Sequence, residues 1–113
     1  MEQVSELVNS FMLELRRGTI ILAVLGQLRK PEYGYSLVTI LETDGFTVEP
    51  GTLYPLLRRL EKQGVLVSEW DTSETRPRKY YLLSELGIQV YEQLCVEWTN
   101  MIHHIETIIN KKG

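Results

Sequence analysis

The stretch PGTLYPLLRRLEKQG, residues 50–64, decides how the rest of the chain is arranged. Its leucines recur at i, i+3, i+4 and i+7, which places them on one stripe of an α-helix: Leu53, Leu56, Leu57 and Leu60. Pro50 and Pro55 are tolerable only near the first helical turn, where a missing N–H has no intrahelical partner. Gly64 is placed to end the helix in a left-handed conformation. The stretch therefore predicts an amphipathic helix with a buried leucine face.

The opposite face of this predicted helix is basic and polar. Away from the leucines lie Thr52, Pro55, Arg58, Arg59 and Lys62, with Tyr54 on the flank. A helix of this kind can pack on a core and enter a DNA major groove. A solvated surface helix of any fold shows the same pattern. The segments on either side must decide between the two interpretations.

After this helix the apolar period changes from 3.6 to 2. Residues 65–70 and 78–83 predict two strands, joined by the polar turn 71–77. The two strands form a hairpin whose tip is expected to carry Arg76, Arg78 and Lys79. Tyr80 and Tyr81 must point to opposite faces of their strand, and one of them is expected in the core.

Residues 85–110 predict one long helix that begins at a Ser84 cap. Its apolar residues step by 3, 4, 3, 4 and 3, which is a coiled-coil seam: Tyr91, Leu94, Trp98, Met101, Ile105 and Ile108. A seam this apolar predicts a partner helix, and the simplest partner is a second copy of the chain. The spacing leaves open whether Trp98 stacks a planar ligand or only packs in a dimer core.

The N-terminal third predicts three helical segments. Residues 4–15 carry an apolar stripe that needs burial: Val4, Leu7, Val8, Phe11 and Leu15. Residues 16–18 are expected to interrupt this helix, and Thr19 to cap a second one that runs to Leu28. A third, short element opens at residues 32–35, carries an apolar stripe over residues 37–41 and ends at residues 44–45.

This order of elements predicts a mainly α fold with a small β-hairpin. It is a winged helix-turn-helix with an N-terminal helix and a long C-terminal dimerisation helix. We expect a DNA-binding domain over residues 1–83 and a dimerisation helix over residues 84–113.

Composition indicates one globular domain of 113 residues with a net charge of −3. The charge is unevenly distributed, because residues 50–83 hold six Lys or Arg and four Asp or Glu, whereas residues 84–110 hold four Glu and no Lys or Arg. No apolar run is long enough to span a bilayer, and the acidic N-terminus does not resemble a secretory signal. A single cysteine agrees with a reducing, cytoplasmic setting. No catalytic motif is visible, and no cofactor or metal is expected.

Four segments in this order resemble the PadR-like family of bacterial transcriptional regulators. They are RRGTIILAVLGQL, EYGYSLV, GTLYPLLRRLEKQGVL and RPRKYYLLSELG, and they span residues 16–87. The single C-terminal helix looks like the short subfamily, which includes repressors of multidrug exporters whose dimers bind flat hydrophobic compounds between subunits. The resemblance implies a homodimer that binds double-stranded operator DNA, usually represses, and often responds to a small planar hydrophobic effector.

The resemblance also implies roles for individual residues. The DNA-binding set is Tyr33, Tyr35, Thr52, Tyr54, Pro55, Arg58, Lys62, Arg76, Arg78 and Lys79. Trp98 matches the central tryptophan of the short subfamily, and the apolar stripes around it complete a ligand-binding set of Phe11, Leu15, Trp98, Met101 and Ile102. The same apolar stripes, and not the resemblance, give the dimer-interface set: Leu7, Val8, Phe11, Tyr91, Leu94, Trp98, Met101, Ile105 and Ile108. Within the first set, Tyr33 is expected to be more exposed than Tyr35. Arg59, on the opposite flank of the same helix, lies outside this set and is expected to be structural.

Two other functions remain open. A winged-helix module that binds protein instead of DNA would fit the acidic net charge. A metal-sensing repressor would use Cys95, His103 and His104, although their spacing matches no common metal-binding motif.

Overall fold

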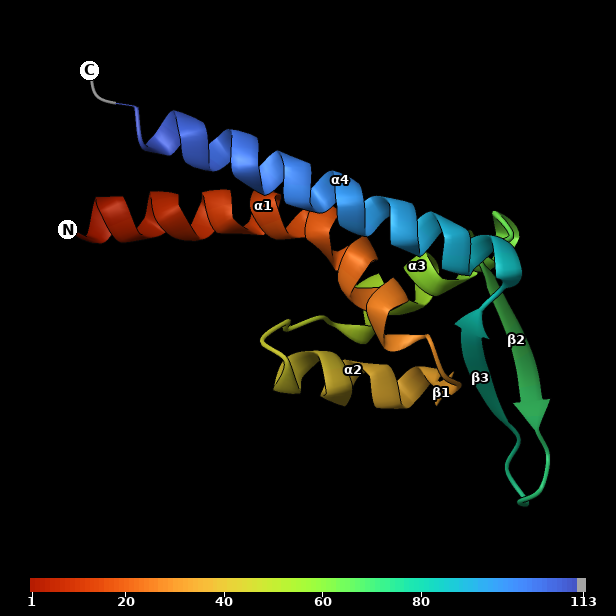
Figure 1. The fold of residues 1–113 in the computed structure, drawn as a ribbon. Coiled ribbons are helices and arrows are strands. Elements are labelled where there is room, and N and C mark those ends of the chain that lie inside the picture. The colour runs from red at the N-terminus through yellow and green to blue at the C-terminus, as the bar shows by residue number, and fades with distance from the viewer. Residues whose placement is uncertain (112–113) are drawn as a thin grey trace.

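The computed structural model describes residues 1–111 and contains a winged helix-turn-helix, as the sequence predicts (Figure 1). The elements are α1 (Glu2–Gln27), β1 (Glu32–Tyr33), α2 (Gly34–Thr43), α3 (Pro50–Lys62), β2 (Leu66–Asp71), β3 (Arg78–Leu83) and α4 (Glu85–Ile109). Helices α2 and α3 form the helix-turn-helix, and the β2–β3 hairpin is the wing.

The N-terminal region is one helix, so the predicted break at residues 16–18 is wrong. Thr19 does not cap a new helix, because its hydroxyl donates to the Arg16 carbonyl within α1 at 3.1 Å. One glycine inside a helix costs only about 1 kcal/mol, less than packing of the helix gains. The helix bends between its exposed half and the half that enters the core (Figure 1). Glycine within a helix and a threonine hydroxyl that bonds to a carbonyl of the preceding turn both favour such a bend, and α1 has Gly18 and Thr19.

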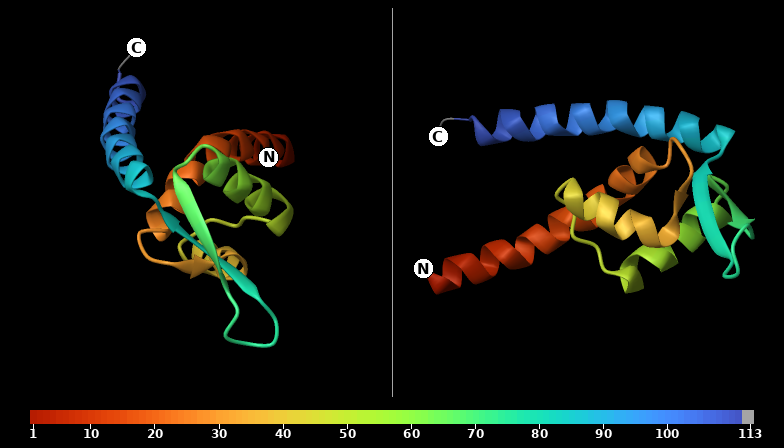
Figure 2. Two further views of the ribbon diagram at one scale, coloured as in Figure 1. Left: turned by 90° about the vertical axis from the view of Figure 1, so that its right-hand side faces the viewer. Right: turned by 90° about the horizontal axis from the view of Figure 1, so that it is seen from below.

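The sheet has three antiparallel strands in the order β1-β3-β2. The predicted hairpin is confirmed, and Trp70 on β2 pairs with Lys79 on β3. Strand β1 was not predicted, because two residues are too short to show alternation. Arg78 and Lys79 lie within β3, so of the three cations expected at the wing tip only Arg76 lies in the turn. That turn projects beyond the helical body (Figure 2).

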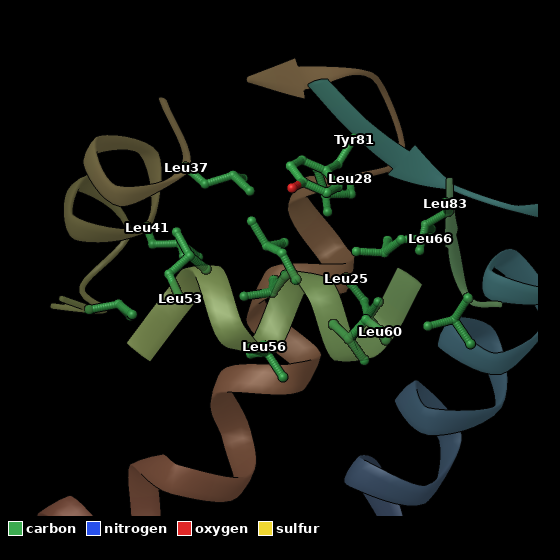
Figure 3. Packing of buried hydrophobic residues seen from close by; sticks show 14 residues of the cluster. Leu25, Leu28, Leu37, Leu41, Leu53, Leu56, Leu60, Leu66, Tyr81 and Leu83 are labelled. Atoms are coloured by element: carbon green, nitrogen blue, oxygen red, sulfur yellow. The ribbon is translucent and has the colours of Figure 1, made fainter. Parts of the chain in front are cut away.

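A single core lies between the helices and the sheet (Figure 3). All four leucines predicted on α3 are buried. They pack with leucines of α1, α2 and the wing, among them Leu25, Leu28, Leu37, Leu41, Leu66 and Leu83. Tyr81 is the tyrosine that enters the core, at 4 % exposure. Tyr80 instead donates a hydrogen bond to Glu69 at 2.5 Å.

The start of α4 is joined tightly to the end of α3. The predicted cap is confirmed, since Ser84 Oγ accepts from the Gly87 N–H at 2.9 Å and donates to the Gly64 carbonyl at 2.6 Å. Gly64 has the predicted left-handed conformation, with φ of 86°. Gly87 lies so close to the wing that a Cβ there would be 2.0 Å from the Val65 carbonyl oxygen.

The molecule is elongated, because the first half of α1 and the last half of α4 extend beyond the core (Figures 1 and 2). Its radius of gyration is 17.0 Å, whereas a compact domain of this length has about 13 Å. The two helices contact each other at the core and splay apart toward their free ends. Within residues 1–111, none of the helices has the length and apolar character that crossing a membrane requires.

Candidate nucleic-acid interface

The exposed face of α3 carries the side chains that the sequence predicts there. Thr52, Pro55, Arg58 and Lys62 are exposed, whereas Tyr54 is half-buried. Tyr54 packs over Gly34 at the start of α2, where an added Cβ would be 2.9 Å from the tyrosine ring. Among residues 1–111, Arg58 forms no ion pair. Its guanidinium is therefore available to an external anion.

A groove of about 720 Å³ lies between the start of α2, the exposed side of α3 and the wing. Six residues of the predicted DNA-binding set line it: Tyr35, Tyr54, Arg58, Arg76, Arg78 and Lys79. Four others, Tyr33, Thr52, Pro55 and Lys62, lie outside it. The groove thus places the helix-turn-helix and the wing on opposite sides of one basic channel. Trp70 also lines the groove, although the sequence pattern predicts for it only a place in a strand.

Arg78 is engaged inside the protein. Its guanidinium donates to the Tyr35 hydroxyl at 3.0 Å and to the Glu74 carboxylate at 2.9 Å. It also lies 4.6 Å above the centre of the Tyr33 ring. The Tyr35 hydrogen bond, followed by the charge of Glu74, raises the pKa of Arg78 above its ordinary value. Arg78 therefore holds the wing against the entry of α2.

Lys79 is also paired, with Glu61 on α3 at 3.3 Å. Glu61 accepts a second hydrogen bond from Ser68 on β2. The Ser68 hydroxyl and then Lys79 lower the pKa of Glu61 below its ordinary value. Lys79 thereby connects the wing to α3.

The expected order of exposure for the two tyrosines is wrong. Tyr35 is 53 % exposed, and Tyr33 is half-buried. The Tyr33 hydroxyl donates to Asp71 at the end of β2, and this bond raises the pKa of Tyr33. Their rings stack with centroids 5.6 Å apart. Tyr33 is therefore part of the support of the site, and Tyr35 is the tyrosine that lines the groove.

Arg76 differs from its two neighbouring cations. It is exposed in the turn of the wing and forms no ion pair within the part of the chain that the structure describes. Arg58 on α3 and Arg76 on the wing are thus the two unpaired arginines that line the groove. Arg59 is exposed on α3 but does not line the groove, and no described contact gives it the structural role expected for it.

A second, largely apolar pocket of about 630 Å³ lies between α1 and α4. Leu15, Trp98, Met101 and Ile102 of the predicted ligand-binding set line it. Phe11 does not, because it lies further along the exposed half of α1 at 59 % exposure.

The predicted dimer-interface residues fall into two groups. Tyr91 and Leu94 are half-buried against the protein's own core. The others are exposed within this chain: Leu7, Val8, Phe11, Trp98, Met101, Ile105 and Ile108. The free halves of α1 and α4 therefore carry a large apolar surface that this chain does not cover.

Among residues 1–111, no three His, Cys, Asp or Glu side chains gather in a way that could hold a metal ion. His103 and His104 are exposed on α4 with ring centroids 6.1 Å apart, and Cys95 is a half-buried free thiol.

A helix-turn-helix and a wing that flank one basic groove define a winged-helix regulator that binds DNA. The chain belongs to the PadR-like family of transcriptional regulators, whose model matches residues 21–93. This membership favours DNA over protein as the partner of the winged helix.

The chain is also similar to individual proteins that are described as transcriptional regulators. The transcriptional regulator Rv3488 of Mycobacterium tuberculosis is 39% identical over 77 residues, which are 67% of this chain and 72% of that protein. The crystal structure of a PadR family transcriptional regulator from Eggerthella lenta is 42% identical with a TM-score of 0.94, and the match covers 99% of this chain and 100% of that one. A PadR-like transcription factor from Bacteroides fragilis is 31% identical with a TM-score of 0.74, covering 88% and 98% of the two chains.

Proposed function

We propose that this regulator is a homodimeric repressor in which each α3 enters a major groove of its operator. The observation that carries the proposal is the position of Arg58 and Arg76 on opposite sides of one groove, because neither arginine has an acidic partner within residues 1–111. Arg58 is suited to read guanine or to neutralise a phosphate, and Arg76 is suited to a phosphate. Thr52, Tyr54, Pro55 and Lys62 complete the helix surface, and Tyr35 adds a hydroxyl at the entry of α2.

Dimerisation is supported by the two protruding helices. In water, exposed apolar side chains such as Phe11 and Ile105, at 59 % and 54 %, favour association with a matching surface. A second copy offers the same two helices across a two-fold axis. In this proposal residues 1–83 bind DNA, residues 84–113 form most of the dimer contact, and α1 contributes its exposed half. The half-sites lie about 34 Å apart or a little more.

The pocket between α1 and α4 supports a small planar hydrophobic effector. It is lined mainly by apolar side chains, and Trp98 offers an aromatic face for stacking. A ligand there changes the angle between α1 and α4. In a dimer this moves the two α3 helices relative to each other, so that they no longer match the half-sites and repression is relieved.

The test measures binding of the purified protein to duplex DNA from upstream of its own coding region. Fluorescence anisotropy of the labelled duplex gives the affinity at each salt concentration of a series. The expected result is sequence-selective binding of two chains per site that weakens steeply with salt. Equal affinity for unrelated duplex would contradict operator recognition. In a transcription assay on the same DNA, the protein should lower transcript yield, and an increase would contradict the repressor role. A planar aromatic dye that quenches Trp98 without releasing DNA would contradict the effector mechanism.

A further inference from the structure

Trp70 is a large apolar side chain in a groove whose other lining residues are mostly arginine, lysine and tyrosine, with Gly34 and Pro77. It lies on β2, is 63 % exposed, and lines the groove together with Arg58 and Arg76. Single exposed apolar residues are common on protein surfaces, so exposure alone does not indicate a binding role for Trp70. Its position in the wing does.

The alternation of β2 places Leu66, Ser68 and Trp70 on one face of the sheet. Leu66 is buried in the core, and Ser68 donates to Glu61 on α3. Trp70 comes next on this face, beyond the residues that pack on α3. The apolar face of the wing therefore continues past the core and into the groove.

Lys79 lies beside the indole of Trp70 and also beside the ring of Tyr81, 5.3 Å from its centre. It is the cross-strand partner of Trp70, and its ammonium lies 5.9 Å from the centre of the ring. A cation at this distance is attracted to an aromatic face. Lys79 is itself held by Glu61 at 3.3 Å. The indole is therefore supported from inside the protein by Lys79.

We propose that Trp70 packs against a deoxyribose of the DNA strand that occupies this groove, while Arg58 and Arg76 neutralise phosphates beside it. A DNA backbone alternates charged phosphates with less polar sugars, and the groove presents arginines and an indole to match. An indole supplies a large, rigid contact area for such a sugar. The inference rests on the proposed function, because it assumes that duplex DNA enters the groove. It adds a contact that contributes affinity without carrying sequence information.

The first test compares DNA affinities of the full-length protein and three variants across a salt series. Trp70→Ala should weaken binding about tenfold, the effect of losing roughly 60 Å² of apolar contact. The loss should be equal on operator and unrelated duplex. The slope of affinity against salt should stay unchanged, because no phosphate contact is lost. Trp70→Phe should retain most of the affinity. Val67→Ala is the matched control, since Val67 is an exposed apolar residue on the other face of β2 and should bind as the native protein does.

The second test measures acrylamide quenching of tryptophan fluorescence. Duplex DNA should shield Trp70 and lower the quenching of the native protein. In Trp70→Phe the remaining Trp98 lies between α1 and α4, so DNA should leave the quenching unchanged. This readout decides the question even if Trp70→Ala does not fold.

The outcomes separate the two proposals. The proposed contact between Trp70 and a deoxyribose is overturned if DNA leaves the acrylamide quenching of the native protein unchanged, or if Trp70→Ala binds DNA with the native affinity. In either case, salt-sensitive DNA binding by the native protein leaves the proposed function intact. A loss that is equal in Trp70→Ala and Val67→Ala also overturns the contact. A native protein that binds no duplex overturns the proposed function, and the contact with it.

Discussion

The ammonium of Lys79 on β3 lies 3.3 Å from the carboxylate of Glu61 on α3, and this ion pair joins the wing to the helix that faces the groove. Glu61 also accepts a hydrogen bond from Ser68, on the second strand of the wing. One carboxylate on α3 therefore contacts both strands of the hairpin. The distance between the two sides of the groove depends on this contact as well as on the core.

The Lys79–Glu61 pair should be detectable as a coupling energy. Glu61→Gln and Lys79→Met, made singly and together, should give a coupling in unfolding free energy of about 0.5–1 kcal/mol, because water screens a partly exposed pair. Denaturant unfolding measures it. The matched control pairs Glu61→Gln with Arg59→Met, because Arg59 is exposed on the same helix and forms no ion pair within residues 1–111. Additive effects of the first pair would contradict the contact.

Arg58 and Arg76 should each account for part of the salt dependence of DNA binding. Replacing either by Ala should reduce the slope of log affinity against log salt by about 1, because one phosphate contact is lost. Fluorescence anisotropy between low and moderate salt measures the slope. Arg59→Ala is the control, because it removes another exposed arginine of α3 that does not line the groove. An equal change in slope for that control would show that net charge, and not position in the groove, decides binding.

The proposed dimer should dissociate when a charge is placed on either protruding helix. Phe11→Asp and Ile105→Asp should each shift sedimentation from the dimer toward the 13.1 kDa monomer, because a buried unpaired carboxylate is strongly unfavourable at an interface. Val67→Asp adds the same charge at an exposed apolar site on the wing and should leave the mass unchanged. A native protein that sediments as a monomer at micromolar concentration would rule out the dimer.

Asp71 should make the stability of the wing dependent on acid pH. Hydrogen bonds from Ser73 and then from Tyr33 lower its pKa to about 2. A carboxyl whose pKa is lower in the folded state than in the unfolded state stabilises the fold at every pH above its unfolded pKa. This stabilisation is lost as the pH falls from the unfolded pKa toward the folded pKa. Asp71→Asn should therefore have a lower Tm than the native protein above pH 5, and the difference should shrink between about pH 4 and about pH 2.

Circular dichroism melts across this pH range measure the difference. Glu92→Gln is the control, because Glu92 is exposed on α4 and accepts no hydrogen bond from the described side chains. If the difference in Tm between the native protein and Asp71→Asn stays constant down to pH 2, hydrogen bonding to the Asp71 carboxylate is not the cause of its stabilising effect.

Two glycines should respond to alanine in opposite directions. Gly18→Ala should raise stability by about 0.5–1 kcal/mol, because Gly18 lies inside α1 and nothing lies within 4 Å of an added Cβ. Gly87→Ala should lower stability by about 1–3 kcal/mol or more, because the Cβ would meet the Val65 carbonyl oxygen at 2.0 Å. Denaturant unfolding of the two variants checks both. No gain from Gly18→Ala would favour the helix break at residues 16–18 over a continuous α1.

Local sequence patterns predicted the parts of the fold that local patterns determine. The bounds of α3 follow from four leucines on one stripe and from Gly64, and those of α4 follow from the Ser84 cap and a long apolar seam. The break expected in α1 was wrong because local helix propensity at Gly18 was given more weight than packing of the residues that follow. Strand β1 has no signal of its own and forms by pairing with β3, almost fifty residues later.

The candidate site was predictable in outline and not in detail. The sequence predicted Arg58 on the exposed face of a helix and Arg76 in the turn of the hairpin, where the structure has them, but it does not distinguish a free cation from a paired one. The partners of Arg78 and Lys79 include Tyr35 and Glu61, which are 43 and 18 residues away. Alternation along β2 could have placed Trp70 on the same face as Ser68. Only the fold shows that this face continues into the groove.

The separation of charge along the molecule has a consequence for how it searches a genome. Helix α4 carries four glutamates and no lysine or arginine, and its C-terminal half extends away from the wing (Figure 1), while the net charge of the chain is −3. We expect a polyanion such as DNA to be repelled by this helix and attracted by the arginine side, so that the charge distribution orients the protein during approach. In the proposed function, encounters that present α4 to DNA are then disfavoured, and a larger share of encounters begins with the groove facing the duplex.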